Sequence, residues 1–385
     1  MSYKGNRLTF FPPKNKGALF FVFITLLALF ITFDSHAADT CKIKHLNSPT
    51  PASVLKVNTP SELTAQRGVN QYQISCSVKN GGVLSFLRPG LDSFTWQQNN
   101  TVKAPLKAGQ VAYLMDSGAF TATITLESKL NYTPRFKWQP THIYFKKAQQ
   151  HSLVMGSFYG LCITLIFYVL IMGHRLNESV FKLYSIYIFC IGSFILLQEG
   201  QLYLFVTQHV SGVIFNLYLL SIGLTVLSAT WFMLALLETN KRWPKLTKLL
   251  KTLACTVMLC AVLKMLVTDL LFWTIAGHIM AYSSLFIVAV IFTLAAMQAL
   301  KGVREATLVF VALSFVLVSM IFRVLLINQS PFMQRYGFVL AFAVESFLLA
   351  VAVSRRISRM RIAQKRAETE ADYDPLCGIL NRRGW

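Results

Sequence analysis

The pattern of hydrophobic and polar residues changes abruptly near residue 151. Beyond that point the apolar runs reach the roughly 17–25 residues that a helix needs to cross a membrane. Seven such runs follow one another with short polar segments between them, at 152–173, 180–199, 212–236, 249–268, 271–295, 305–327 and 337–354. The pattern therefore predicts a membrane domain of seven helices over residues 151–354.

Residues 38–150 have shorter apolar runs, with turn residues between them. From Ala119 to Leu126, threonines alternate with apolar residues, which is the period of a half-buried strand. Asn80-Gly81-Gly82 is a strong turn signal between two such runs. We predict an all-β sandwich or jelly-roll domain, with strands near 71–78, 83–87, 94–97, 110–115, 119–126 and 141–145.

The first 37 residues have the layout of an export signal. Four basic residues precede an apolar run without charge from Ala18 to Phe33, and Ser35-His36-Ala37 follows as a cleavage site. We expect residues 1–37 to be a signal peptide, with an uncleaved anchor as the alternative. In either case the domain at 38–150 is delivered across the membrane.

The composition supports the membrane assignment. Charged residues make up 14% of the chain and hydrophobic ones 54%, whereas soluble proteins carry about 25% charged residues. The net charge of +21 would suggest nucleic acid in a soluble protein. Since no arginine-rich patch is interleaved with aromatic residues, we do not expect a nucleic-acid partner.

The basic residues instead predict the orientation, because Lys and Arg gather on the cytoplasmic side of membrane proteins. With residues 38–150 outside, the outer loops between the spans carry a single basic residue, Arg335. The inner segments carry Arg175, Lys241, Arg242, Lys245, Lys248, Lys301, Arg304, Arg355, Arg356, Arg359 and Arg361. We expect a multi-pass protein in contact with the lipid bilayer, with its C-terminus in the cytoplasm.

Two charged residues inside the spans need partners, since charge is costly in a bilayer. Arg323 lies near the outer end of the sixth span and Glu345 lies in the outer half of the seventh. Their depths differ by about 6 Å at 1.5 Å per residue. We expect an intramembrane Arg323–Glu345 pair, which serves either as a structural tie or as part of a conformational switch.

The exported domain contains candidate residues of two further kinds. Cys41 and Cys76 are its only cysteines, and outside the cytoplasm such a pair is expected to form a disulfide, with two unpaired thiols as the alternative. Trp96 and Trp138, with Tyr72 and Tyr113, are either a sugar-binding platform or core aromatics, and the core is the favoured interpretation. None of the cysteines has metal-ligand spacing, so we expect no metal site.

The tail holds the most specific motif. After a charged helical stretch at 355–372, Asp374-Pro-Leu-Cys-Gly-Ile-Leu-Asn-Arg-Arg383 resembles the D-x-L-T-G-L-x-N-R-R opening of the GGDEF diguanylate cyclase domain, with Cys377 in place of the usual Thr. The resemblance assigns Asp374, Leu376, Gly378, Asn381 and Arg382 to that opening motif. It places Asn381 against a guanine base.

The rest of the chain resembles the seven-transmembrane receptors with diverse intracellular signalling modules. The resemblance depends on the order of several loose motifs: Met155-Gly-Ser-Phe-Tyr-Gly160, Gly200, Leu300-Lys-Gly-Val-Arg-Glu-Ala306, and Glu345 with Ser354-Arg-Arg-Ile357. In that family a β-sandwich in the periplasm of bacteria binds small ligands, often carbohydrates, and the output domain is cytoplasmic. The resemblance thus implies a bacterial inner-membrane receptor with residues 38–150 as its sensor.

The resemblance also implies a missing output. The family's catalytic hairpin, which holds Mg and GTP and makes cyclic di-GMP, lies downstream of residues 373–385. We therefore expect this chain as written to be no enzyme, to hold no cofactor, and to carry only the start of a truncated cyclase domain. A homodimer through the stalk at 355–372 is expected by analogy.

Three hypotheses follow for the function. The first is a receptor for a diguanylate cyclase output; the second is a non-catalytic interaction module that pairs with full-length relatives; the third is a transporter. Against the third, the spans show no repeat and no mid-span proline. Residues 38–150 carry 13 basic and 5 acidic residues, a net charge of +8, which adds an anion to carbohydrate as a candidate ligand class.

Overall fold

The computed structural model describes most of the chain after residue 39. The described residues are 40–47, 53–55, 61–63, 67–78, 81–86, 91–98, 101–128, 134–174, 179–205, 211–267, 269–325 and 331–372. The predicted signal peptide at 1–37 and the cyclase motif at 373–385 lie outside these residues.

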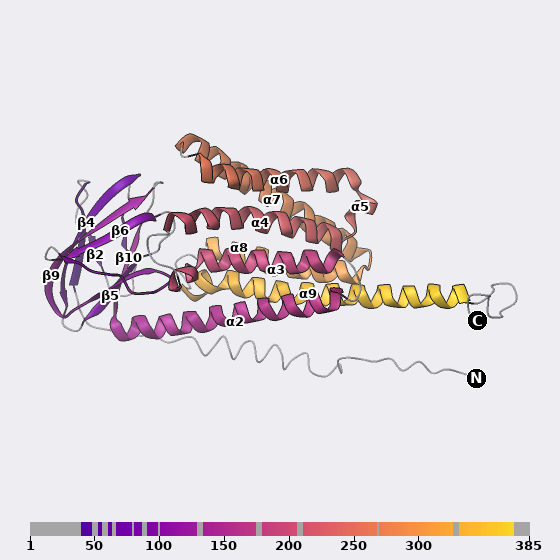
Figure 1. Cartoon of the computed structure of the whole chain (residues 1–385), viewed down its shortest axis with the longest axis horizontal. Coiled ribbons are helices and arrows are strands. Elements are labelled where there is room, and N and C mark those ends of the chain that lie inside the picture. The colour runs from indigo at the N-terminus through magenta and orange to yellow at the C-terminus, as the bar shows by residue number, and fades with distance from the viewer. Residues whose placement is uncertain are drawn as a thin grey trace. The chain divides into compact units, whose positions relative to one another are not determined.

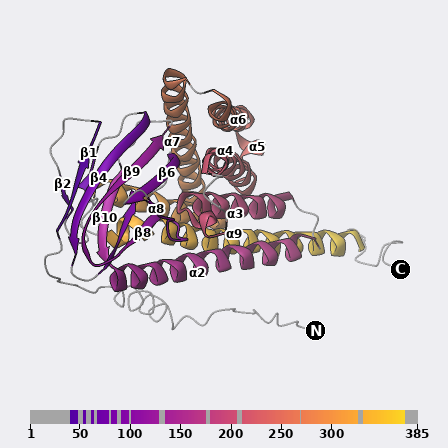
Figure 2. The same ribbon diagram turned by 60° about the vertical axis from the view of Figure 1, so that its left-hand side comes forward.

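The N-terminal part is a sandwich of two antiparallel sheets, which confirms the predicted β-domain ahead of the helices (Figure 1). The larger sheet has the order β2-β1-β4-β9-β6-β7 and the smaller one β3-β10-β5-β8. Figure 2 shows β4, β9 and β6 side by side. The strands are β1 Thr40–His45, β2 Ser53–Leu55, β3 Ser61–Glu62, β4 Gly68–Val78, β5 Gly82–Phe86, β6 Leu91–Gln98, β7 Thr101–Val102, β8 Val111–Met115, β9 Gly118–Ser128 and β10 Arg135–Pro140.

The core of the sandwich lies between the two sheets. Alternate residues of β4 and β9 are buried, as the period of two predicts, and they pack against aromatic residues from both sheets. The turn signal at 80–82 leads from β4 into β5, and these strands belong to different sheets. Gly82 is required there, because a Cβ atom at this position would overlap the Trp138 ring.

The strand expected at 141–145 is wrong. Thr141 begins helix α2, Thr141–His174, which follows β10 without any intervening residue. The neighbouring side chains of Ile143 and Tyr144 are both buried, whereas a strand would point them to opposite faces. Tyr144 packs with Val83 of β5 and Ala112 of β8, so the first turns of α2 cover the outer face of the smaller sheet.

Seven helices are long and apolar enough to cross a membrane, which confirms the predicted bundle and makes the chain a multi-pass membrane protein. They are α2, α3 Ser179–Gln198, α4 Ser211–Leu236, α6 Pro244–Leu266, α7 Leu270–Leu300, α8 Arg304–Leu325 and α9 Pro331–Asp372. The short helices η1 Gln201–Leu204 and α5 Thr239–Arg242 follow α3 and α4.

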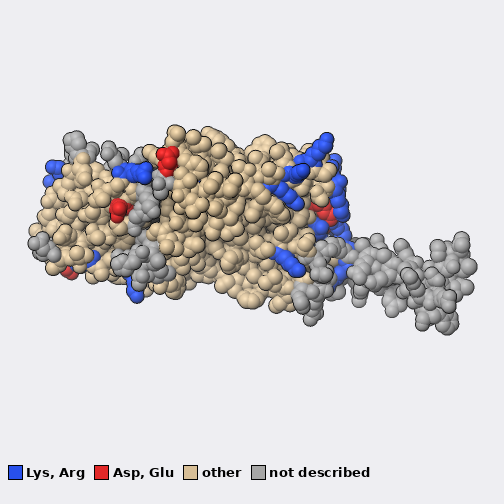
Figure 3. Space-filling model, turned by 45° about the horizontal axis from the view of Figure 1, so that its top comes forward, with Lys and Arg blue, Asp and Glu red and all other residues tan. Residues whose placement is uncertain are grey.

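Charge and exposure fit a bundle in lipid. Figure 3 shows an uncharged middle on the face in view, with Lys and Arg gathered at the end farther from the strands. Large apolar side chains such as Phe167, Phe189 and Leu285 lie exposed on the outside of the bundle, where lipid tails would cover them. Helix α9 runs alongside α2 and continues beyond it (Figure 1).

Candidate functional site

Helix α9 carries the polar contacts that distinguish this bundle from a purely apolar one. It packs against α2, α3 and α8, and it contributes polar residues at three levels: Tyr336 near the sandwich, Glu345 in the middle, and Arg356 at the far end. We treat these three levels as one candidate site, because a single helix joins them.

At the first level, a buried histidine links α2 to α9. His151 Nδ1 lies 3.2 Å from the Tyr336 hydroxyl, and Gln201 Nε2 lies 2.8 Å from His151 Nε2. When Gln201 donates to Nε2, Nδ1 carries the imidazole proton and donates it to Tyr336. Glu199 Oε2 is 3.8 Å from the same Nε2. The cluster thus connects α2, the turn after α3, and α9.

At the second level, two tyrosines of α3 bind α9 inside the membrane domain. The Tyr184 hydroxyl donates to the Ser346 carbonyl at 2.7 Å, and the Tyr187 hydroxyl hydrogen-bonds the Glu345 side chain. Both tyrosine rings contact Phe232 of α4. A polar group at this depth is costly to leave without a hydrogen-bond partner. These hydrogen bonds therefore fix the position of α9 against α3.

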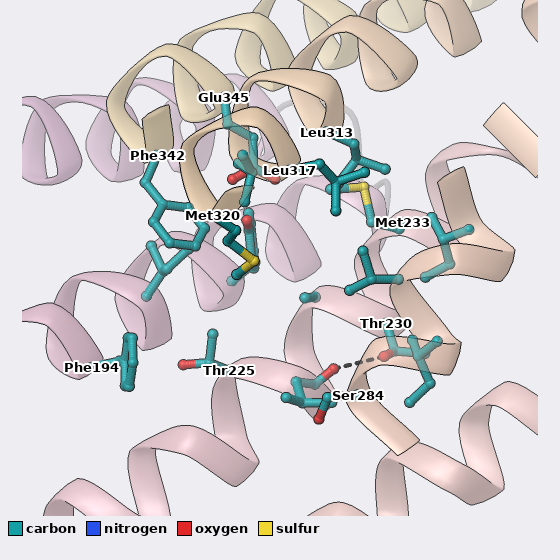
Figure 4. Close-up of a pocket in the computed structure, with 18 of the residues that line it drawn as sticks. Phe194, Thr225, Thr230, Met233, Ser284, Leu313, Leu317, Met320, Phe342 and Glu345 are labelled. Carbon is teal, nitrogen blue, oxygen red and sulfur yellow. Dashed lines mark hydrogen bonds between the residues drawn. The ribbon is translucent and has the colours of Figure 1, made fainter. Parts of the chain in front are cut away.

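Glu345 also forms part of the wall of a mostly apolar cavity of about 250 Å³. Figure 4 places it beside Phe342 and Leu317, with Met233 and Thr230 of α4 across the space. The hydroxyls of Thr225 and Thr230 are already bound to carbonyls of their own helix. Among the described residues that line this cavity, Glu345 is the one with a carboxyl group.

The partner predicted for Glu345 is only partly within the structure. Glu345 is 2% exposed, and its Oε2 has no hydrogen-bond partner among the described atoms. Arg323 lies in α8, but its side chain is outside the residues whose side chains are described. The Arg323–Glu345 pair stays a prediction. It is motivated by the buried Glu345 Oε2, which has no hydrogen-bond partner among the described atoms.

At the third level, Arg356 caps the end of α4. Its Nη1 donates to the carbonyls of Ala235 and Leu236, at 2.8 and 2.9 Å, and its Nη2 lies 3.2 Å from Glu238 Oε1. The last carbonyls of a helix lack partners within the helix and carry its negative dipole end. The guanidinium donates hydrogen bonds to these carbonyls and places a positive charge at the negative end of the dipole. This contact therefore ties α9 to the C-terminus of α4.

Two further contacts complete the third level. Arg359 Nη1 lies 3.4 Å from Glu305 Oε2 at the start of α8. Glu238 lies at a positive φ of 49° between α4 and α5. Burial acts to raise the pKa of Glu238, but the hydrogen bond from Lys241 and the charges of Arg356, Lys241 and Arg359 outweigh it, so the pKa is lowered. Glu238 therefore favours its ionised form, which pairs with Arg356 at this end of α9.

The candidate residues in the sandwich belong to its core. Trp96 and Trp138 are completely buried between the sheets, and Tyr72 and Tyr113 are buried with them. A sugar platform needs exposed ring faces, so the platform alternative is wrong and the core interpretation holds. Cys41 of β1 lies opposite Cys76 of β4, and the two form a disulfide.

Asp374, Leu376, Gly378, Asn381 and Arg382 lie outside the described residues. Two of the motifs that carry the family resemblance, by contrast, lie close together, because Glu305 contacts Arg359 in the turn of α9 that follows Ser354–Ile357. Sequence reasoning singled out Glu345 as a charged residue within an apolar run, but it missed the roles of His151, Gln201, Tyr336 and Glu238.

Comparison with known families agrees with this geometry. The family model for 7TM diverse intracellular signalling matches residues 151–356, which is more than half of the chain. Neither a curated protein nor a solved structure matches the chain significantly. The match begins at His151 and ends at Arg356, the first and last of the three contact levels on α9. The chain therefore belongs to the 7TM diverse intracellular signalling family.

Proposed function

We propose that this chain is a transmembrane signalling receptor whose sandwich senses a small ligand outside the cytoplasm and whose helix α9 carries the response inward. The observation that carries the proposal is the continuity of α9 from Pro331 to Asp372. One unbroken helix holds the contacts at both ends of the bundle and then continues past it. A shift of this helix at Tyr336 is therefore also a shift at Arg356.

Two connections between sandwich and bundle support the sensory role. β10 runs directly into α2, so the smaller sheet and the first membrane helix share one backbone. Gly109 of the sandwich also touches Gly200 after α3, backbone to backbone, and Gly200 has a φ of 68°. A ligand that changes the sandwich would reach α2 and α3 through these contacts, to the extent that it binds the two states with different affinity.

The distribution of charge supports the proposed orientation. The segments at the Arg356 end carry many basic residues, whereas the described residues 199–205, 267 and 269 at the other end carry none, and Arg335 lies in the first turns of α9. Under the positive-inside rule the Arg356 end is cytoplasmic. Residues 355–372 then form a cytoplasmic stalk, and the sandwich lies in the periplasm of a bacterial inner membrane.

The output we propose is a diguanylate cyclase that joins two GTP molecules with Mg. It follows from the resemblance at 374–383, and it requires a dimer, which the stalk at 355–372 would form between two copies of this chain. The ligand classes proposed are a carbohydrate, from the resemblance, and an anion, from the basic charge of residues 38–150.

A chimaera tests the receptor function. Residues 1–372 are fused to an intact cyclase domain, and cyclic di-GMP is measured with and without residues 40–148. We expect removal of the sandwich to change the output while membrane insertion, followed by protease protection, stays normal. An output that ignores the deletion would show that the sandwich is no sensor.

A further inference from the structure

A cavity of about 250 Å³ lies where the sandwich, α2, η1 and α9 meet. Four basic side chains from three parts of the chain line it: Lys107 and Lys137 of the sandwich, Lys147 of α2, and Arg335 of α9. Among the described residues that line the cavity, none is acidic. The signalling route proposed for α9 assigns no role to these four basic side chains.

Local structure explains why these groups converge. Trp138 points into the core of the sandwich, so its strand neighbour Lys137 points out of the smaller sheet, toward α2. Lys147 and His151 are four residues apart on α2 and therefore share one face. Arg335 precedes Tyr336, which contacts that histidine. The cavity thus borders the first contact level of α9.

The electrostatics of the cavity favour an anionic ligand. Burial, and then the charges of Lys147 and Arg335, lower the pKa of Lys137 to about 8. Like charges brought together in a partly dry site disfavour one another. A bound anion would offset that repulsion, and charged hydrogen bonds to it are stronger than neutral ones.

We propose that this cavity binds the anionic group, a carboxylate or a phosphate, of a small molecule, and that the anion joins Lys107 and Lys137 of the sandwich to Arg335 of α9. Its volume is below the roughly 300–1,000 Å³ of sites that hold drug-sized ligands, which suits a small charged group. Leu106, Tyr144 and Leu204 add an apolar part of the wall for the remainder of the molecule. The anion is either free or the headgroup of a lipid.

The position of the site predicts that anion binding affects signalling, and this prediction rests on the receptor function proposed above. The same anion would touch the sandwich and the first turns of α9. Binding would therefore favour one relative position of these two elements, by the difference in its affinity for the two positions. Binding itself is independent of the output and is tested separately.

The test uses the full 385-residue chain in nanodiscs of phosphatidylcholine, with inorganic phosphate and succinate as probes in isothermal titration calorimetry. We expect at least one probe to bind. Lys107→Gln and Arg335→Gln should each weaken that binding about tenfold or more, since a hydrogen bond to a charged group contributes about 1.5–3 kcal/mol. Lys107 is exposed, so its replacement leaves folding intact.

Lys103→Gln is the matched control. Lys103 lies in the same loop as Lys107, but it pairs with Asp116 on the surface at 3.2 Å and does not line the cavity. Equal affinity in all three variants would overturn the proposal. If the soluble probes fail, binding of phosphatidylglycerol is compared by native mass spectrometry in the same variants. If Lys107→Gln and Arg335→Gln lose binding of that lipid, the anion is a lipid headgroup. If these variants bind the lipid as well as the wild type does, the proposal is overturned.

The two proposals fail in different ways. Anion binding without any change in output from the cyclase chimaera would keep this site and contradict its role in signalling, whereas an output that ignores deletion of the sandwich would contradict the receptor function itself. A ligand response that survives Lys107→Gln and Arg335→Gln, in variants that have lost anion binding, would keep the receptor function and contradict the role of this site in it.

Discussion

The sandwich and the helix bundle bury different kinds of residue. Among the described residues, the buried set of the sandwich contains no Asp, Glu, Lys or Arg, whereas the bundle buries Glu305 and Glu345. The sandwich core is closed around Trp96 and Trp138 and crossed by a disulfide. A buried ionisable group lowers stability unless it is paired, so we expect the bundle, rather than the core of the sandwich, to contain any element that changes state.

The largest effect expected concerns the sandwich core. Trp138→Ala should lower the free energy of unfolding by about 3–5 kcal/mol, because a large buried side chain is lost and a cavity remains. Denaturant unfolding of the detergent-solubilised chain measures it. Val102→Ala is the control, since Val102 is 72% exposed and should cost within about 0.5 kcal/mol. A Trp138→Ala variant as stable as the wild type would contradict the role of Trp138 in the core.

A smaller effect is expected at the cytoplasmic end of α9. Arg356→Met removes the donors to Ala235 and Leu236 and leaves these carbonyls and Glu238 without the guanidinium. We expect a loss of about 1–3 kcal/mol in unfolding free energy and an altered output from the cyclase chimaera.

Arg355→Met is the matched control for Arg356, because Arg355 is its exposed neighbour. The two substitutions change the charge equally and differ in the contacts they remove. If both variants behave alike, the capping of α4 has no role in holding α9.

The intramembrane pair should show a coupling of about 0.5–3 kcal/mol. Glu345→Gln and Arg323→Ala, singly and together, form a double-mutant cycle in unfolding free energy. We expect this coupling because the buried Oε2 of Glu345 lacks a hydrogen-bond partner among the described atoms. Each single substitution would also leave the other charged group without its partner. Additive effects would exclude the pair and leave the contact with Tyr187 as the attachment of Glu345.

A further expected effect is a dependence of stability on pH. The pKa of Lys137 is lowered to about 8 in the folded chain, whereas an unfolded lysine has a pKa of about 10.4. Between these values the unfolded chain binds more protons, so stability should rise with pH from about 8 to 10. The groups that face Lys137 are Lys107, Lys147, His151 and Arg335.

Unfolding free energies of the wild-type chain and of Lys137→Met, measured from pH 7 to 10, test this. The rise should be absent in Lys137→Met. Saturating anion should reduce it in the wild type by favouring the protonated lysine. Parallel curves for the two proteins would show that Lys137 does not titrate in this range.

The periodicity of the sequence predicted the seven spans and the strands β4, β5, β6, β8 and β9, because long apolar runs and strict alternation each match one type of element, but it gave no strand at β1 or β10. It failed at 141–145, since five residues are too few to separate a strand from the start of a helix. Glu345 was found because a charge within an apolar run is visible in the sequence. His151 and Tyr336 were missed because 185 residues separate them, and only the fold brings them together.

The central claim is that α9 transmits the response as one continuous helix. Insertion of one, two, three or seven alanines between residues 362 and 363 of the cyclase chimaera tests it, with cyclic di-GMP as the readout. Each inserted residue turns the following helix by about 100°, and seven nearly restore the original direction. We expect one to three alanines to change the output and seven to restore it. An output that is the same for all insertions would contradict transmission through α9.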